Sequence, residues 1–212
     1  AKSLGILTKP VLIGPVTFLL LGKEKLNEAK SVSGSEETFH RLDLLDKIVP
    51  VYIEILNKLK SLGADWVQID EPILVNEINT KTKEAILSAF DRMRKNAPGL
   101  KFMLATYFGR LGDNLKTVVK LPVDALHIDL VRAPEQLDDA LNALPSGMAL
   151  SLGLVDGRNI WKNNMENSLA IIEKAKLKVG GDRLFIGTSC SLLHTPCDLD
   201  LESNEISLPG TV

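Results

Sequence analysis

The sequence predicts an α/β fold, an incomplete (β/α)8 barrel of the TIM type with about six of its eight strands present. Short apolar runs, near-continuous rather than alternating, are typical of parallel strands covered on both faces. Helical patterns separate these runs, and strand–helix–strand order specifies right-handed crossovers. No Gly-x-Gly-x-x-Gly turn follows a run, which favours a barrel over a dinucleotide-binding sheet. The six runs are Val11–Ile13, Trp66–Ile69, Phe102–Ala105, Ala125–Ile128, Ala149–Leu152 and Leu184–Ile186.

The first run belongs to a longer apolar stretch, Val11 to Leu21, interrupted by Gly14 and Pro15. We interpret this stretch as a buried strand followed by its loop. It is much shorter than the roughly 20 apolar residues that cross a bilayer, so no membrane association is expected.

Four helices are expected between the runs, each from an apolar stripe at helical spacing. The first stripe contains Pro50, which predicts a kink or a break in that helix. Gly63 and Gly180 follow two of the stripes and are expected to end those helices with a left-handed residue. The stripes extend over residues 42–59, 85–93, 137–144 and 165–175.

The whole chain, residues 1–212, is predicted to be one partial domain. Ala1–Gly5 resembles the last turn of a helix, so the two missing strands are expected to precede Ala1. Residues 23–38 are polar and rich in Gly and Ser, which predicts a mobile surface loop. Residues 198–212 lack helical periodicity and are expected to form an irregular tail. Two open barrel edges would favour a dimer or an unstable monomer.

Composition excludes several classes of protein. The net charge is -2, and the basic residues are scattered, so no nucleic-acid partner is expected. The two cysteines, Cys190 and Cys197, are separated by six residues and form neither a disulfide framework nor a CxxC pair. With no export leader in the sequence, these features favour a cytoplasmic location.

Polar residues follow every predicted strand and would form a rim at the carboxyl ends, where barrel enzymes place their sites. The same polarity is also expected of strands that simply end there. Asp70 and Glu71 are adjacent and should point to opposite sides, so they are not a glycosidase-like acid and base. The rim residues are Gly14, Pro15, Thr17, Asp70, Glu71, Thr106, Tyr107, Asp129, Arg132, Asp156, Arg158, Asn159, Thr188, Ser189 and Cys190.

Histidines are scarce and give no metal motif. His127 lies inside a predicted strand, where we expect a hydrogen-bonded core or interstrand group, and His194 is expected to be structural. No His-x-Cys or His-x-x-x-His spacing occurs, so spacing predicts no zinc site. Ser189 lacks the Gly-x-Ser-x-Gly elbow of a hydrolase.

Six strings, in order from Lys9 to about Glu202, resemble the amino-terminal half of cobalamin-independent methionine synthases. The most specific is Asp156-Gly-Arg-Asn-Ile-Trp-Lys-Asn. The others are Lys9-Pro-Val-Leu-Ile-Gly-Pro-Val-Thr-Phe, Val67-Gln-Ile-Asp-Glu-Pro-Ile-Leu-Val, Leu104-Ala-Thr-Tyr-Phe-Gly, His127-Ile-Asp-Leu-Val-Arg-Ala-Pro-Glu and Thr188-Ser-Cys-Ser-Leu-Leu-His-Thr-Pro-Cys-Asp-Leu.

This resemblance implies a two-barrel zinc methyltransferase of methionine biosynthesis that needs no cobalamin. Its carboxy-terminal barrel would carry zinc, homocysteine and most of the folate site. Its amino-terminal barrel would pack against that barrel and support the polyglutamate tail of methyltetrahydrofolate. The partners implied for this chain are therefore the catalytic barrel of the same protein and, in the parent enzyme, homocysteine and the folate.

The resemblance also implies that this part of the parent has no catalytic residue and no metal. At the positions of the family's zinc ligands, the His-x-Cys pair is replaced within Leu104–Tyr107, the Glu falls near Asp129 and the last Cys near Cys190. Asp129 and Cys190 are therefore expected to be vestiges, and Asp70 and Glu71 candidate ligand contacts. The alternatives are a non-catalytic packing module or a free-standing barrel methyltransferase or decarboxylase.

Overall fold

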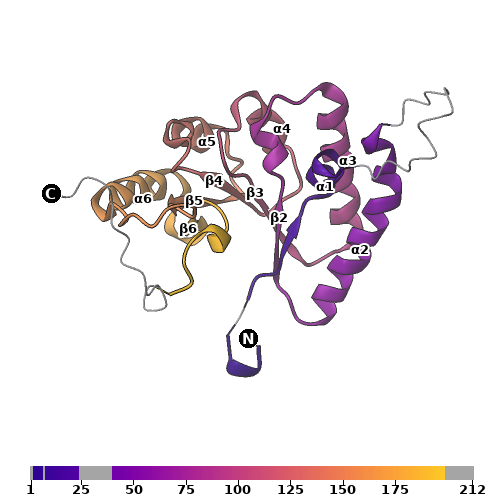
Figure 1. The fold of residues 1–212 in the computed structure, drawn as a ribbon, viewed down its shortest axis with the longest axis horizontal. Helices are drawn as coiled ribbons and strands as arrows, with labels where there is room; N and C mark the ends of the chain where they lie inside the picture. The colour runs from indigo at the N-terminus through magenta and orange to yellow at the C-terminus, as the bar shows by residue number, and fades with distance from the viewer. Residues whose placement is uncertain (1, 7, 24–39, 199–212) are drawn as a thin grey trace.

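A computed structural model describes residues 2–6, 8–23 and 40–198, and the strands within them form one parallel sheet. The six strands follow one another in chain order, so each pairs with the next (Figure 1). This confirms the predicted α/β architecture and every predicted strand, several of which extend one or more residues further. The strands are β1 Val11–Ile13, β2 Trp66–Asp70, β3 Lys101–Ala105, β4 Ala125–Asp129, β5 Ala149–Val155 and β6 Leu184–Thr188.

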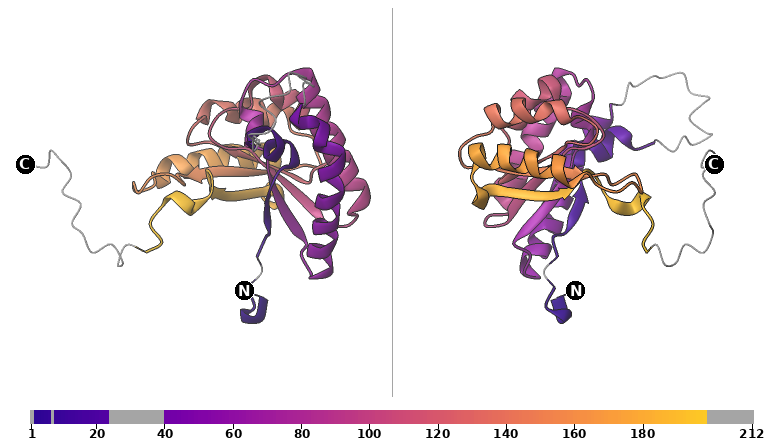
Figure 2. Two further views of the ribbon diagram at one scale, coloured as in Figure 1. Left: turned by 45° about the vertical axis from the view of Figure 1, so that its right-hand side comes forward. Right: turned by 90° about the vertical axis from the view of Figure 1, so that its left-hand side faces the viewer.

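The helices surround one side of the curved sheet and leave its concave side open (Figures 1 and 2). Among the described residues the four predicted helices are present, together with two short α-helices that the periodicity did not reveal. None of the described helices is both long and apolar enough to span a membrane. The helices are α1 Pro15–Leu21, α2 Leu45–Ser61, α3 Thr80–Asn96, α4 Leu115–Val118, α5 Leu137–Ala143 and α6 Met165–Val179.

Two local expectations were wrong. Pro15–Leu21 is a helix rather than the loop after a strand. Pro15 occupies the first turn of α1, where its missing N–H would have had no partner in the helix. Pro50 does not break α2, which continues to Ser61, so the expected break was wrong and the alternative of a kink stays a prediction. Because Pro50 lies near the start of this helix, its ring removes only one early hydrogen bond.

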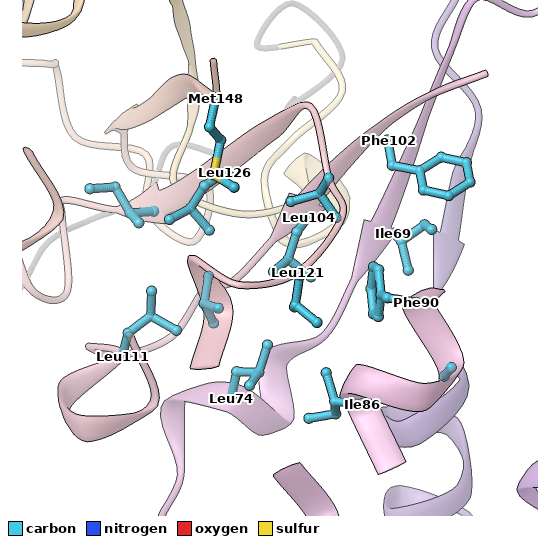
Figure 3. Packing of buried hydrophobic residues seen from close by; sticks show 14 of the residues in the cluster. Ile69, Leu74, Ile86, Phe90, Phe102, Leu104, Leu111, Leu121, Leu126 and Met148 are labelled. Atoms are coloured by element: carbon cyan, nitrogen blue, oxygen red, sulfur yellow. The ribbon is translucent and has the colours of Figure 1, made fainter. Parts of the chain in front are cut away.

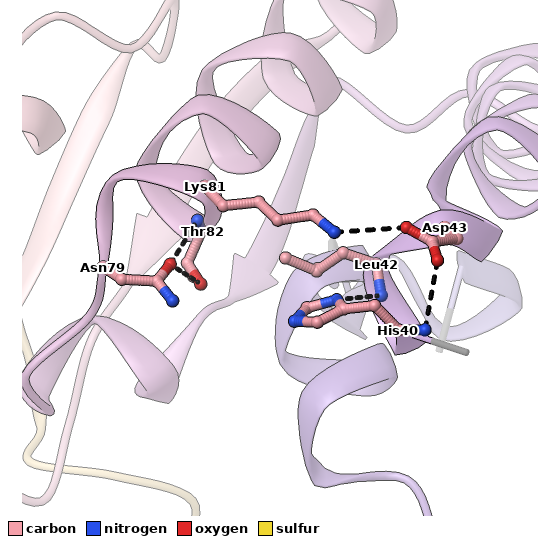
Figure 4. Close-up of polar contacts among 6 residues, drawn as sticks. All are labelled: His40, Leu42, Asp43, Asn79, Lys81 and Thr82. Atoms are coloured by element: carbon pink, nitrogen blue, oxygen red, sulfur yellow. Dashed lines mark hydrogen bonds and ion pairs between the residues drawn. The ribbon is translucent and has the colours of Figure 1, made fainter. Parts of the chain in front are cut away.

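The ends of α2 and α6 agree with what the sequence predicts. Gly63 and Gly180 adopt φ values of 86° and 84°, as expected for residues that end α2 and α6. The start of α3 is capped by Asn79, whose Oδ1 accepts a hydrogen bond from the Thr82 N–H at 2.9 Å. Lys81 of α3 donates to Asp43 at 3.2 Å and joins the start of α3 to the 3-10 helix Arg41–Leu44 that precedes α2 (Figure 4).

The main core lies between the sheet and the helices. Side chains of alternate strand positions, such as Ile69, Phe102 and Leu126, are fully buried there against Ile86 and Phe90 of α3 and other helical residues (Figure 3). A second, small cluster on the concave side contains Met103, Ala125 and Ala149, with Trp66 packed against it. The helical side of the sheet is therefore covered by a large apolar core, whereas the concave side carries only a small apolar cluster.

Strands β1 and β6 are the edges of the sheet among the described residues. Their side chains include exposed apolar groups, with Val11 at 53% and Ile186 at 60% exposure. These edges are the basis for the expected dimer or unstable monomer, which stays a prediction. Of the expected surface loop (23–38) and the expected irregular tail (198–212), only Lys23 and Asp198 belong to the described residues. The other residues of both segments lie outside them.

Candidate functional site

The concave side of the sheet contains a cavity of ≈ 390 Å³. Parallel register brings its lining together, because Gln68 of β2 lies opposite Val11 and Met103, and Ser151 of β5 lies opposite His127 and Phe185. The strand alternation therefore turns one polar row of side chains toward the cavity. Its polar lining consists of Lys9, Gln68, Asp70, Tyr107, His127, Ser151, Thr188, Cys190 and Ser191.

Asp70 at the end of β2 is the one aspartate of this lining and is 8% exposed. Its Oδ1 accepts a hydrogen bond from Gln68 Nε2 at 2.8 Å, and its Oδ2 accepts one from the Tyr107 hydroxyl at 3.2 Å. Burial raises the pKa of Asp70, although both hydrogen bonds and the charge of Lys9 act in the opposite direction. Burial and the Asp70 carboxylate also raise the pKa of Tyr107, which keeps its hydroxyl a donor.

Glu71 turns away from the cavity, as strand alternation requires of the neighbour of Asp70. Its carboxylate is fully buried and accepts hydrogen bonds from the backbone N–H groups of Val16 at 3.2 Å and Thr17 at 2.8 Å. These N–H groups belong to the first turn of α1, which has no internal partners for them. Burial raises the pKa of Glu71 to about 7. Glu71 therefore anchors α1 to β2.

Asp129 at the end of β4 is 1% exposed, and its carboxylate oxygens accept hydrogen bonds from backbone N–H groups. Its Oδ1 accepts hydrogen bonds from Val131 N–H at 3.0 Å and Arg132 N–H at 2.9 Å, and its Oδ2 accepts one from Phe108 N–H at 2.9 Å. The carboxylate thus fixes the turn after β4 and the loop after β3. It does not line the cavity.

Cys190 is a free, buried thiol at the end of β6 and lines the cavity. Its Sγ lies 3.6 Å from the carbonyl oxygen of Ser191, to which it donates. Burial raises the pKa of this thiol, which disfavours the thiolate that metals bind. Cys197 is also free, and exposed.

His127 joins β4 to β5 and β6, which confirms its expected role as a hydrogen-bonded interstrand group. Nδ1 lies 2.9 Å from the Ser151 hydroxyl and Nε2 lies 3.4 Å from the Ser189 carbonyl oxygen. Because a carbonyl oxygen only accepts, Nε2 carries the proton and Nδ1 accepts from Ser151. Burial lowers the pKa of His127 and favours this neutral form.

A family model described as "Cobalamin-independent synthase, N-terminal domain" matches residues 1–180. The chain belongs to the cobalamin-independent methionine synthase family. It is 49% identical over 210 residues to a 5-methyltetrahydropteroyltriglutamate–homocysteine methyltransferase of Flavobacterium johnsoniae, covering 98% of this chain and 26% of that protein. A protein of the same name from Xylella fastidiosa strain M23 is 50% identical over 204 residues, with 96% and 25% covered. The chain therefore spans about a quarter of these relatives.

Solved structures of the methionine synthase family share the fold. A putative vitamin-B12 independent methionine synthase from Listeria monocytogenes superposes with a TM-score of 0.62 at 14% identity, over 87% of this chain and 57% of that one. A B12-independent methionine synthase from Shewanella sp. W3-18-1, in complex with selenomethionine, gives a TM-score of 0.63 at 17% identity, over 76% and 52%. Both likenesses support an incomplete barrel.

The four residues singled out from the sequence do not form one site. Asp70 and Cys190 line the cavity. Glu71 and Asp129 lie outside it and accept hydrogen bonds from backbone N–H groups. No group of three or more His, Cys, Asp or Glu side chains with metal-binding geometry occurs among residues 2–6, 8–23 and 40–198. The Asp129 and Cys190 side chains do not fit a zinc ion, since the carboxylate oxygens already accept three backbone hydrogen bonds.

Lys9, Gln68 and Ser151 also line the cavity, and the sequence patterns did not predict this. Each belongs to an apolar run or flanks one, so none stands out as a site residue. The signal that reveals Gln68 and Ser151 is the period of two within a strand: Gln68 shares its side with Asp70, and Ser151 lies opposite His127. Lys9 precedes β1 and is recognised only from its position in the fold.

Proposed function

We propose that this chain is part of the amino-terminal barrel of a zinc-dependent methyltransferase in the cytoplasm. The parent enzyme would transfer a methyl group from 5-methyltetrahydropteroyltri-L-glutamate to L-homocysteine and form methionine without cobalamin. Zinc in the carboxy-terminal barrel would lower the pKa of the homocysteine thiol and make its thiolate the nucleophile. The residues of this chain would act as a scaffold and support the folate, and none of them would be catalytic.

Support for the scaffold role comes from how the strand-end carboxylates are used. Glu71 and Asp129 direct their oxygens to backbone N–H groups of α1 and of the loops after β3 and β4. Each carboxylate therefore fixes the position of a rim segment. A fixed rim is suited to packing against a second domain, because its shape is set before contact.

A second support is the apolar rim, which we define as Ile160, Trp161, Leu192 and Leu193. These residues follow β5 and β6 at the carboxyl ends of the strands, and they are 53–84% exposed. Exposed large apolar side chains at one end of a sheet are typical of interaction surfaces. We infer that the apolar rim packs against the carboxy-terminal barrel, and that residues 1–212 form one partial domain of the parent.

The reaction is tested by expressing the complete coding sequence in a bacterium that lacks methionine synthases, on medium without methionine or cobalamin. Growth is expected, and growth only when cobalamin is supplied would contradict the proposed reaction. The packing role is tested with Trp161→Ala and Leu193→Asp in the complete protein, which should lower activity about tenfold or more. The matched control is Leu177→Asp, since Leu177 is 88% exposed on α6 at the opposite end of the strands.

Calorimetry separates a scaffold from a folate site within this segment. The 212-residue chain is titrated with 5-methyltetrahydropteroyltri-L-glutamate. The scaffold role predicts no measurable heat, because tight binding would require the other barrel. Micromolar binding by the 212-residue chain would place a folate site in the segment itself and contradict a purely supporting role.

A further inference from the structure

Arg158 carries a charge that the described part of the chain leaves without a counter-ion. It follows β5 at the carboxyl ends of the strands and is exposed. Among residues 2–6, 8–23 and 40–198 its side chain joins no ion pair within 4.0 Å and donates no hydrogen bond. Its guanidinium carbon lies 5.0 Å from the centroid of the Phe108 ring instead. The N–H donors of Arg158 are therefore available to a partner outside this segment.

The Phe108 ring next to this guanidinium is held in place. The backbone N–H of Phe108 donates to Asp129 Oδ2 at 2.9 Å, and Asp129 is 1% exposed. Tyr107 contacts the ring edge-on at a centroid distance of 4.7 Å. A fixed aromatic face attracts a cation and limits the positions that a long side chain samples. Arg158 is thus oriented before any partner arrives, which lowers the entropy that binding would cost.

The carboxylate of the same loop, Asp156, is already used by the loop itself. Its Oδ1 accepts a hydrogen bond from the backbone N–H of Arg158 at 2.9 Å, and its Oδ2 accepts one from Asn159 Nδ2 at 2.6 Å. The bond from Asn159 chiefly holds the pKa of Asp156 below its ordinary value, and the nearby charges of Arg132 and Arg158 act in the same direction. Arg132 is exposed and also joins no ion pair among the described residues. The loops after β4 and β5 therefore leave two cations near Asp156 without an ion pair.

Part of the apolar rim belongs to the same loop as Arg158. Ile160 and Trp161 follow it by two and three residues and are 55% and 66% exposed. Arginine and tryptophan are over-represented among the residues that dominate protein interfaces. The chain spans about a quarter of its relatives, so most of such a protein lies outside this segment. On the basis of the packing role proposed above, we propose that Arg158 pairs with a carboxylate side chain of the carboxy-terminal barrel, inside the contact that the apolar rim makes.

Hydrogen–deuterium exchange of residues 156–163 in the complete protein, without added folate, tests this pairing. Arg158→Gln removes the charge and should speed the exchange at least about tenfold, because the contact then opens more often. Arg158→Lys keeps a charge but loses the planar fork, so it should restore part of the protection. Lys178→Gln removes an exposed cation at the end of α6, at the opposite end of the strands, and as the control should leave the exchange unchanged. Circular dichroism confirms that each variant is folded.

The same acceleration by Arg158→Gln in the 212-residue chain would overturn the pairing, because Arg158 would then act only within this segment. No recovery in Arg158→Lys would overturn it too, since the charge would not matter. Protection of residues 156–163 that requires added 5-methyltetrahydropteroyltri-L-glutamate would assign the carboxylate to that ligand instead of the protein. Leu193→Asp, in the apolar rim, separates this inference from the packing role. Faster exchange in Leu193→Asp but not in Arg158→Gln would overturn the pairing alone, and unchanged exchange in both would overturn the packing role as well.

Discussion

The side chain of Glu71 fills the space that a side chain at Gly14 would need. A Cβ added at Gly14 would lie 2.1 Å from Cδ and 2.2 Å from Oε1 of Glu71. The glycine is therefore required by a close approach between the start of α1 and the end of β2. The carboxylate cannot retreat, since it is buried and bonded to the N–H groups of Val16 and Thr17.

Gly14→Ala should consequently destabilise the chain by about 2–3 kcal/mol, the range of severe overpacking. Urea unfolding followed by circular dichroism measures the change. Gly147→Ala is the matched control, because a Cβ there meets no atom within 4 Å, and its effect should stay within about 0.5 kcal/mol. Equal midpoints for the two variants would show that Glu71 moves aside at little cost.

Glu71 should also make stability depend on pH. Its pKa is raised from 4.5 to about 7, so the folded chain binds this proton more tightly than the unfolded chain does. The stabilisation is complete below pH ~4.5 and is lost as the pH rises to ~7, by up to about 3 kcal/mol. Glu71→Gln cannot ionise and should lack this decline. Urea midpoints of both proteins at several pH values test this, and parallel pH profiles would contradict it.

The positions of the strands were readable from the sequence because a strand covered by helices on one side and packed on the other needs a continuous apolar run. Helix α1 was not, since its apolar residues continue the run of β1 and its one polar residue, Thr17, is buried, so no polar face reveals the helical period. The partners of Glu71 were also unpredictable. Val16 and Thr17 lie more than fifty positions earlier in the sequence, and only the finished fold directs their N–H groups at the carboxylate.

The cavity shows the same limit. Asp70 and Cys190 could be nominated because polar residues follow strands in a barrel. Lys9 could not, since a lysine before a strand is usually solvated, and its place in the cavity depends on the curvature of six paired strands. Asp129 could be placed at a strand end from the sequence, but its burial and its three backbone donors, which come from two different loops, could not.

Arg94 connects α3 to the strands, and its shape should matter as much as its charge. Its guanidinium donates to the carbonyl oxygens of Pro122 and Leu100, both at 2.8 Å, and to Asp124 Oδ2 at 2.5 Å. Arg94→Lys keeps one charge but loses the planar fork, so a loss of about 1–3 kcal/mol is expected. Arg92→Lys is the control: Asp46, its partner, is 88% exposed, and the loss should be below about 0.5 kcal/mol.

Thermal and urea unfolding of the two lysine variants measure this difference. If Arg94→Lys and Arg92→Lys were equally mild, the three hydrogen bonds of Arg94 would contribute little beyond a surface ion pair.

Asp129 should stabilise the chain without help from zinc. Replacing it with Ala leaves the N–H groups of Phe108, Val131 and Arg132 without their acceptor, which should cost about 2–4 kcal/mol. Adding zinc or EDTA should change the melting temperature of the unaltered 212-residue chain by less than about 1 °C, because no ligand saturates a site that is not formed. A zinc-dependent rise that disappears in Asp129→Ala and Cys190→Ser would instead establish a metal site at these residues.

Phe108 is the only described non-glycine residue with a positive φ, at 76°. Its N–H donates to Asp129, and its ring contacts Tyr107 edge-on at a centroid distance of 4.7 Å and lies 5.0 Å from the Arg158 guanidinium carbon. Both Phe108→Gly and Phe108→Ala remove the ring and keep the N–H. Glycine adopts this φ freely, whereas alanine retains the strain.

Phe108→Gly should therefore be more stable than Phe108→Ala by about 1 kcal/mol, the reverse of the usual order, in which glycine is the less stable because its unfolded chain has more freedom. Arg110, two residues later, is exposed and does not have a positive φ, so Arg110→Ala should be at least as stable as Arg110→Gly. Urea midpoints of the four variants give both differences. Alanine exceeding glycine at position 108 would mean that the loop relaxes once the ring is removed, and that the Asp129 carboxylate alone does not hold the strained conformation.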